Sequence, residues 1–253
     1  MKQNAYCTGL VSVSFRERTP REIVQAAVAA GLFTIEWGSD VHAPCHDIER
    51  LKEIARLQEE YGVTCSSYGT YFRLGVTPIG ELSAYIDAAK LLETGILRLW
   101  CGDKSGAEMT VQEKDALIEQ CRLAAAIAEK RGVTLCMECH RGTLTQSPED
   151  AVALMETVHS KSFRMYWQPF QWLDEQGNLA VARAVAPYTE HIHVFHWRDK
   201  QKLPLSEAVG TWRSYLSAFF TPRTLLLEFM PDGRLESLAK EAEALRRIVG
   251  DES

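Results

Sequence analysis

Residues 110–140 read TVQEKDALIEQCRLAAAIAEKRGVTLCMECH, a helical pattern followed directly by a strand pattern. Thr110 and Glu113 form the Ser/Thr-x-x-Glu capping box that opens many helices. Gly132 stands where a residue in the left-handed conformation commonly ends a helix. The run TLCMEC that begins at Thr134 is apolar enough for a buried strand. The stretch therefore predicts one helix followed by one strand of a parallel sheet.

The same unit recurs along the whole chain. Apolar or β-branched runs start about every 27 to 38 residues, close to the length of a βα unit. With the run at Thr134, the predicted strands start near Tyr6, Phe33, Thr64, Ile96, Arg164, His191 and Thr224. Eight such units predict a single α/β domain over residues 1–253, a (β/α)₈ TIM barrel. A doubly wound open sheet is the alternative, but no G-x-G-x-x-G follows the first strand and no P-loop is present.

Helix start and stop signals agree with this division. Thr19 and Glu22 form a second capping box, and Ser147 precedes a proline at the expected start of another helix. Four glycines follow helical runs, where we expect left-handed caps: Gly31, Gly62, Gly95 and Gly132.

Composition excludes several classes of partner. The net charge is −6 and no basic run occurs, which argues against nucleic acid, because such binding needs many Lys and Arg contacts to phosphate. No apolar stretch is long enough to span a membrane. Residues 1–10 lack the apolar region of a signal peptide, so we expect a cytoplasmic protein. A homo-oligomer is left open.

The seven cysteines give an odd count without a disulfide-like spacing. Cys136 and Cys139 form a C-x-x-C, but within a strand residues three apart point to opposite faces. We therefore expect reduced thiols and neither a shared zinc nor a disulfide.

Polar residues stand at the ends of four consecutive predicted strands, the end of a TIM barrel where active sites lie. Glu138 shares a face with Cys136 and His140, and Glu228 ends the apolar run from Thr224. Gln168 ends the strand before His191, and His193 lies on the strand after it.

Neighbouring strands should bring Glu138, Gln168, His193 and Glu228 together. Two carboxylates, an imidazole and an amide oxygen suit Mn²⁺, Mg²⁺ or Co²⁺. A divalent cation would also relieve the repulsion between two close carboxylates. Any one of these residues taken alone is more readily explained as a structural group than as a metal ligand. We interpret His191 as such a structural histidine.

A buried ion pair is predicted inside the barrel. In ILRLWC (96–101) the leucines suit the helix-facing side, so Arg98 and Trp100 point inward. In FTIEW (33–37) the same parity leaves Glu36 inside. Because an isolated buried charge is very costly, Arg98 and Glu36 should pair directly or through one water.

Several longer motifs make the chain resemble a known family. They are MECHRGTLTQSPEDA (137–151), MYWQPFQW (165–172), HIHVFHW (191–197), LLLEFMPD (225–232) and GLFTIEWGSDVHAP (31–44). The chain resembles the xylose isomerase-like TIM-barrel family of sugar isomerases and epimerases, which also includes AP endonuclease-type members. The resemblance implies that Glu138 and Glu228 are both metal ligands and the catalytic acid–base pair, with His193 as a third ligand. The family's strand-six ligand is usually aspartate, and Gln168 stands in that place.

Substrate contacts follow in part from the resemblance and in part from position. Where ketose epimerases of the family carry a substrate-binding histidine, this chain has Gln171. Their strand-seven arginine has no clean counterpart, since Asp199 falls at its offset and Arg198 is adjacent; we include Arg198 among the expected substrate contacts. By position we add His42, Trp100, His140 and His196. Of the aromatic residues in predicted loops, we expect some to stack on a sugar ring and most to pack against helices: Phe15, Trp37, Tyr68, Tyr71, Trp100, Trp172 and Trp197.

The predicted function is a metal-dependent keto-sugar isomerase or epimerase, with Mn²⁺ as the first choice and Mg²⁺, Co²⁺ or Zn²⁺ as alternatives. The metal would stabilise an enediolate while the two glutamates move protons. The small-molecule substrate is expected to be unphosphorylated, since no cluster of Gly and Lys/Arg near a helix start offers a phosphate site. A lyase or hydratase acting on a keto-sugar is the alternative. A metal-dependent phosphodiesterase and a non-catalytic sugar-binding barrel rank below it.

Overall fold

The computed structural model describes residues 6–198 and 200–250, and within them eight parallel strands form a closed barrel. The barrel strands are β1 (Cys7–Val11), β2 (Thr34–Gly38), β3 (Thr64–Leu74), β4 (Ile96–Cys101), β5 (Thr134–Glu138), β6 (Phe163–Trp167), β7 (Thr189–Val194) and β10 (Thr224–Leu227). Each strand pairs with its neighbours in sequence order, and β10 closes the ring against β1. All eight predicted strands are present, which confirms the (β/α)₈ fold.

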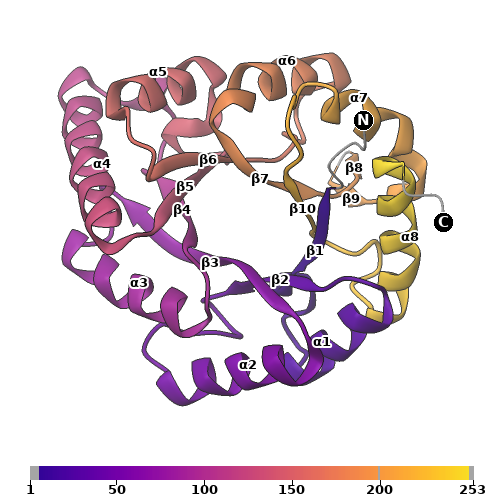
Figure 1. Ribbon diagram of the computed structural model, residues 1–253. Helices are drawn as coiled ribbons and strands as arrows, with labels where there is room; N and C mark the ends of the chain where they lie inside the picture. Colours follow the sequence, from indigo (N-terminus) through magenta and orange to yellow (C-terminus); the bar gives the residue numbers. More distant parts are fainter. Residues whose placement is uncertain (1–5, 199, 251–253) are drawn as a thin grey trace.

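Helices surround the barrel as an outer ring (Figure 1). They are α1 (Pro20–Ala29), α2 (Ile48–Tyr61), α3 (Leu82–Leu91), α4 (Val111–Arg131), α5 (Pro148–Val158), α6 (Glu175–Val185), α7 (Val209–Leu216) and α8 (Leu238–Val249). Within the part of the chain that the structure describes, none of these helices is long and apolar enough to cross a membrane.

The predicted helix signals hold with one exception. Thr19 and Glu22 form the capping box of α1, and Thr110 with Glu113 forms that of α4. The prediction for Gly95 is wrong, because its φ is not positive. The helix α3 ends earlier, and Glu93 takes the left-handed conformation instead, with φ +63°.

The core has two parts. The larger part packs between strands and helices and includes Cys139. A smaller apolar cluster contains Val11, Cys136, Tyr166 and Leu226, which the alternation of the strands places inside the barrel. Cys136 and Cys139 therefore lie on opposite faces of the sheet, as predicted, and all seven cysteines are free.

A short hairpin after β7 has no counterpart in the sequence prediction. Its strands β8 (Trp197–Arg198) and β9 (Gln201–Lys202) pair antiparallel, and the amide of Leu203 donates to the carbonyl of His196 at 2.8 Å to close its base. Strands of two residues are too short to leave a periodic pattern in the sequence.

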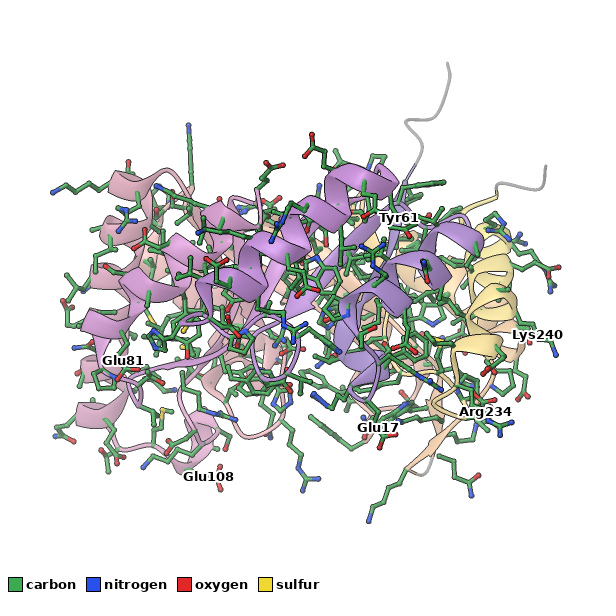
Figure 2. The ribbon with its side chains drawn as sticks, turned by 90° about the horizontal axis from the view of Figure 1, so that it is seen from below. Glu17, Tyr61, Glu81, Glu108, Arg234 and Lys240 are labelled. Carbon is green, nitrogen blue, oxygen red and sulfur yellow. The ribbon has the colours of Figure 1, made fainter. Side chains whose placement is uncertain are left out.

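The loops that follow the strands gather at one end of the barrel. In the side view, Glu17, Glu108 and Arg234, from the loops after β1, β4 and β10, lie toward one end, whereas Tyr61 at the end of α2 lies toward the other (Figure 2). The first of these ends is the C-terminal end of the parallel strands, where the polar strand-end residues also lie.

Candidate active site

A buried ion pair crosses the barrel beneath its C-terminal end, as the strand parity predicts. The Nε of Arg98 on β4 lies 2.9 Å from Oε1 of Glu36 on β2, and both side chains are buried. Burial alone would raise the pKa of Glu36, but His193 and Arg98 outweigh it and hold this pKa well below its usual range. Glu36 is therefore a permanent carboxylate.

Glu36 is also a hydrogen-bond acceptor for three other buried groups. The Tyr166 hydroxyl donates to its Oε2 at 2.6 Å, and the Ser67 hydroxyl donates to the same oxygen at 3.1 Å. His193 Nε2 lies 3.2 Å from this oxygen. Together with Arg98, these groups satisfy both carboxylate oxygens, which fixes Glu36 and everything bonded to it.

The bond from His193 to Glu36 decides which ring nitrogen faces the barrel mouth. Burial alone would lower the pKa of His193, but Glu228 and Glu36 outweigh it and raise this pKa to about 10, so both ring nitrogens carry a proton in the metal-free protein. When Nε2 keeps the proton that it donates to Glu36, loss of the other proton leaves a free lone pair on Nδ1. That Nδ1 lies 3.3 Å from Oε1 of Glu138 and 3.4 Å from Oε2 of Glu228. Neither Nδ1 nor this Glu228 oxygen has a hydrogen-bond partner, although both are buried.

Glu138, at the end of β5, is held by donors on its other oxygen. Arg98 Nη1 lies 2.6 Å from Oε2, and the Trp100 indole donates to the same atom at 2.5 Å. Burial raises the pKa of Glu138, but Arg98 and His193 outweigh this effect and lower it. One oxygen is thus fixed by protein donors, and the other faces His193.

Glu228 follows β10 and is held less tightly. Its amide donates to the carbonyl of Val194 at 3.0 Å, which extends the pairing of β10 with β7 by one residue. The next residue, Phe229, has φ +61°, a conformation that is uncommon for a bulky side chain and that often marks functional sites. Burial, helped by the nearby carboxylate of Glu138, raises the pKa of Glu228 to about 7.

Gln168 lies just past the end of β6 and faces the same cavity as the two glutamates. Its amide nitrogen donates to the carbonyl of Cys139 at 3.1 Å. The amide oxygen is then the atom that this side chain has to offer to a ligand.

The donor set can be tested for a divalent cation. Among the described residues, no group of three or more His, Cys, Asp or Glu side chains is already arranged to hold a metal ion. The chemistry nevertheless fits. A cation bound at Nδ1 would displace the proton that the surrounding carboxylates hold on His193. The three buried carboxylates would then face Arg98 alone, which leaves two negative charges for a divalent cation to balance. Glu138, His193 and Glu228 would hold it. Their assignment as ligands, with Gln168, stays a prediction.

A cavity of about 670 Å³ opens above these residues, and we call it the mouth pocket. Aromatic side chains form much of its wall. The rings of Tyr71 and Trp100 meet edge to face at 5.1 Å, and those of Trp197 and Phe229 lie 4.9 Å apart. Such walls suit the apolar faces of a sugar ring.

The predicted substrate contacts divide into three groups. Trp100, His140 and Gln171 line the mouth pocket. His196 and Arg198 line an adjoining cleft of about 390 Å³. His42 does not line the mouth pocket, so its position gives no support to the predicted substrate contact. It is buried, with Nδ1 at 3.1 Å from the Ser12 hydroxyl and Nε2 at 3.2 Å from the Arg18 carbonyl.

Other residues take structural places. Trp37 and Tyr68 are buried and donate to Gln58 and to the Ala43 carbonyl, at 2.8 and 2.6 Å. Phe15 is buried in the core as well. His191 lies 3.1 Å from the carbonyl of Ser66, in agreement with a structural role.

Sequence reasoning missed two members of the buried network. Tyr166 precedes Gln168 by two residues, so the two side chains point to the same face of the strand. The alternation of the strand alone could therefore have placed Tyr166 inside the barrel. Ser67 had no such signal, because β3 shifts its register against β2 between Ile35 and Glu36.

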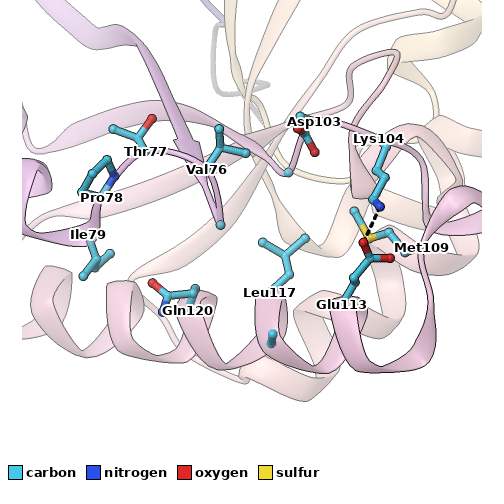
Figure 3. A pocket seen from close by; sticks show the side chains of 13 residues that line it. Val76, Thr77, Pro78, Ile79, Asp103, Lys104, Met109, Glu113, Leu117 and Gln120 are labelled. Carbon is cyan, nitrogen blue, oxygen red and sulfur yellow. Dashed lines mark hydrogen bonds and ion pairs between the residues drawn. The ribbon is translucent and has the colours of Figure 1, made fainter.

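A second cavity lies on the side of the barrel and is larger, about 810 Å³. This lateral groove runs between the loops after β3 and β4 and the helix α4 (Figure 3). Its floor includes Leu117, and Lys104 pairs with Glu113 across one end at 2.6 Å. It contains none of the buried carboxylates, so the mouth pocket is the candidate active site.

Comparisons with known proteins agree with this fold. The probable 3-DHS dehydratase AsbF of Bacillus anthracis superposes with a TM-score of 0.78 at 16% identity, covering 94% of this chain and 98% of that one. An L-ribulose 3-epimerase gives 0.72 at 15% identity, with 97% and 94% covered. A xylose isomerase-like TIM barrel protein of Mycobacterium smegmatis in complex with magnesium gives 0.67 at 15%, with both chains fully covered.

These likenesses are structural, and no curated protein sequence matches the chain. A family model does match, over residues 24–248, and its description is xylose isomerase-like TIM barrel. The match spans most of the chain and includes every strand from β2 to β10, so this protein belongs to the xylose isomerase-like TIM barrel family.

Proposed function

We propose that this protein is a divalent-metal-dependent enzyme that isomerises or epimerises a keto-sugar by moving a proton on a carbon next to the carbonyl group. One observation carries the proposal. His193 Nδ1 lies 3.3 and 3.4 Å from carboxylate oxygens of Glu138 and Glu228, and both glutamates line an aromatic-walled cavity. Two carboxylates set this way can serve opposite faces of a bound sugar.

Each residue has a distinct task in this proposal. Glu228 accepts the carbon-bound proton, since its Oε2 has no hydrogen bond to lose. Glu138 is held by Arg98 and Trp100 on one oxygen, and its other oxygen, which faces His193, delivers the returning proton. Between turnovers Glu138 takes up this proton from solvent and Glu228 releases its own to solvent, so that the protons balance. A metal ion held by the three side chains would act as a Lewis acid and stabilise negative charge on the substrate oxygens.

The aromatic walls exclude water from the reacting carbon. Trp100 forms one side, and Trp197 with Phe229 forms another. An enolised sugar is reactive, and a dry site limits its side reactions.

A dehydratase is the second candidate, because it begins with the same proton removal and then expels a neighbouring hydroxyl. The structural likeness to the probable 3-DHS dehydratase, at a TM-score of 0.78, supports this second candidate. In this chain Gln171 stands where ketose epimerases of the family carry a substrate histidine, which favours a different substrate geometry.

The test is an isotope-exchange assay. The Mn²⁺-loaded protein is incubated in D₂O with a panel of keto-sugars, and loss of carbon-bound protons is followed by NMR. An isomerase or epimerase returns deuterium into an intact sugar, whereas a dehydratase releases an unsaturated carbonyl product that absorbs in the ultraviolet. If neither label nor product appears across neutral and acidic keto-sugars, the proposal fails.

A further inference from the structure

The charge lining the mouth pocket changes sign between its floor and its rim. The floor carries Glu138 and Glu228, whereas the rim carries Arg16, Arg141 and Lys200. The chain as a whole has a net charge of −6. A cationic rim on an acidic protein is a local feature that attracts negatively charged ligands.

Two of the rim cations have no acidic partner. Arg16 is occupied, because it pairs with Asp40 and donates to the Tyr71 hydroxyl at 2.6 Å. Arg141 and Lys200, by contrast, form no ion pair with any residue in the ranges 6–198 and 200–250. Both are exposed to solvent.

Arg141 is nevertheless placed by its surroundings. It follows β5 by three residues, and its guanidinium lies 6.0 Å from the ring centre of Trp172. That ring stacks on Phe170 at 4.5 Å, so the cation rests against a fixed aromatic pair. A guanidinium held by an aromatic face keeps its planar fork of donors free for a carboxylate.

Lys200 is placed by the hairpin β8–β9. It lies in the tight turn between the two strands with φ +69°, which is uncommon for a residue with a side chain. The hairpin also carries Lys202, whose ammonium lies 5.2 Å from the ring centre of Phe229 and 5.9 Å from that of Trp197. The hairpin thus brings positive charge to the aromatic wall of the pocket.

From this arrangement we propose that the substrate is a keto-sugar acid, with its carbonyl end at the Glu138–Glu228 floor and a carboxylate at its far end bound by Arg141 and Lys200. This rests on the proposed function only for the orientation of the carbonyl. A carboxylate fits better than a phosphate, because phosphate sites usually present backbone amides at a helix N-terminus or a glycine-rich turn. Here the donors are side chains from separate loops.

Three sugars that differ only at carbon 6 provide the test. D-fructose ends in a hydroxymethyl group, D-fructuronate in a carboxylate, and D-fructose 6-phosphate in a phosphate. Binding to the Mn²⁺-loaded protein is measured by quenching of tryptophan fluorescence, since Trp100, Trp172 and Trp197 line the pocket. The variants are Arg141→Gln and Lys200→Gln. Arg122→Gln on α4, which removes an equal charge from an exposed pair with Glu119, is the matched control.

We expect D-fructuronate to bind about tenfold more tightly than D-fructose, which corresponds to about 1.4 kcal/mol. Arg141→Gln and Lys200→Gln should each remove most of this preference without changing the affinity for D-fructose, and Arg122→Gln should leave both affinities unchanged. A higher salt concentration should weaken the binding of D-fructuronate and leave the binding of D-fructose unchanged.

Equal binding of the two sugars, or equal losses in the Arg141 and Arg122 variants, would overturn the carboxylate site. Tighter binding of D-fructose 6-phosphate than of D-fructuronate would replace the carboxylate by a phosphate. The proposed function fails separately: selective binding of D-fructuronate without any deuterium exchange keeps the subsite and removes the isomerase. Exchange on D-fructose without any preference for the acid does the reverse.

Discussion

Replacing Glu36 by glutamine should destabilise the barrel more than any loss of an exposed charge. The substitution keeps the size of the side chain and an oxygen acceptor, but it removes the negative charge that faces Arg98 at 2.9 Å and His193 at 3.2 Å. It also puts an amide group next to the hydroxyls of Tyr166 and Ser67, which donate hydrogen bonds to Glu36. An amide nitrogen cannot accept a hydrogen bond from either hydroxyl.

The magnitude follows from burial. Removing one partner of a buried ion pair typically costs about 3–5 kcal/mol, because the other charge stays buried without compensation. Here Arg98 keeps its contact with Glu138, so we expect the lower end, about 3 kcal/mol. For a protein of 253 residues, each kcal/mol shifts the Tm by roughly 2–4 °C, so the expected fall is roughly 6–12 °C.

Urea and thermal unfolding followed by circular dichroism provide the measurement, on chelator-treated protein at pH 7. Glu190→Gln is the matched control, because Glu190 also pairs with an arginine at 2.9 Å, but its side chain is 36% exposed. An exposed pair of this kind contributes at most about 1 kcal/mol. The pKa of Glu36 is held below its usual range. Its stabilisation is therefore complete above the unfolded-state pKa and is lost as the pH falls, so wild type and Glu36→Gln should converge in acid.

A Glu36→Gln variant as stable as Glu190→Gln would refute this reasoning, since it would mean that the pair contributes no more than an exposed one. A loss of stability that stayed constant from neutral to acid pH would contradict the electrostatic origin of the effect and would indicate a packing defect instead.

Three further predictions concern the floor of the mouth pocket. Glu138→Gln and Glu228→Gln should each lower kcat by roughly 10²–10⁴-fold, because general acid–base catalysis contributes that much, and circular dichroism should show that the fold is retained. Glu149→Gln at the start of α5 should leave kcat unchanged. Equal activity of all three variants would contradict the assignment. Gln168→Asp should tighten Mn²⁺ binding in a titration of chelator-treated protein, because a charged oxygen replaces a neutral one; an unchanged affinity would remove Gln168 from the ligand set. Burial raises the pKa of Glu228 from 4.5 to about 7. The protonated side chain therefore stabilises the fold fully below the unfolded-state pKa, and this stabilisation is lost as the pH rises through 7. The expected loss in the free energy of unfolding is about 3 kcal/mol. Unfolding of chelator-treated protein across this range should show the fall, and Glu228→Gln should flatten it; an equally steep fall in the variant would assign it to another group.

The barrel could be predicted because its signals are local and repeated. Each strand is an apolar run and each helix start is a short capping motif, so that Thr19 or Thr110 can be identified without knowledge of the rest of the chain. Where two local signals compete, the prediction fails. Gly95 looked like the end of α3, but the helix stops at Leu91, and the left-handed position falls on Glu93.

The interior of the site was predictable only as far as strand parity reaches. Parity placed Arg98 and Glu36 inside and facing each other, and the ion pair is present. Parity cannot give the height of a residue in the barrel when a strand shifts register, as β3 does, and Ser67 was missed for that reason. Loop residues have no parity, so neither the place of Lys200 in the turn of the β8–β9 hairpin nor the buried position of His42 could be foreseen.

The two glutamates on the floor are held in opposite ways, and this assigns them different tasks in the proposed reaction. Glu138 accepts from Arg98 and Trp100 on one oxygen, so gaining a proton there would mean losing two charge-assisted or polar contacts. Glu228 has an oxygen with no such bond, and its pKa lies near neutrality, where a group exchanges protons most readily. The two glutamine variants should therefore differ in kind. Glu138→Gln disturbs the contacts of Arg98 and so both stability and turnover, whereas Glu228→Gln removes a proton acceptor and leaves the buried network beneath it intact.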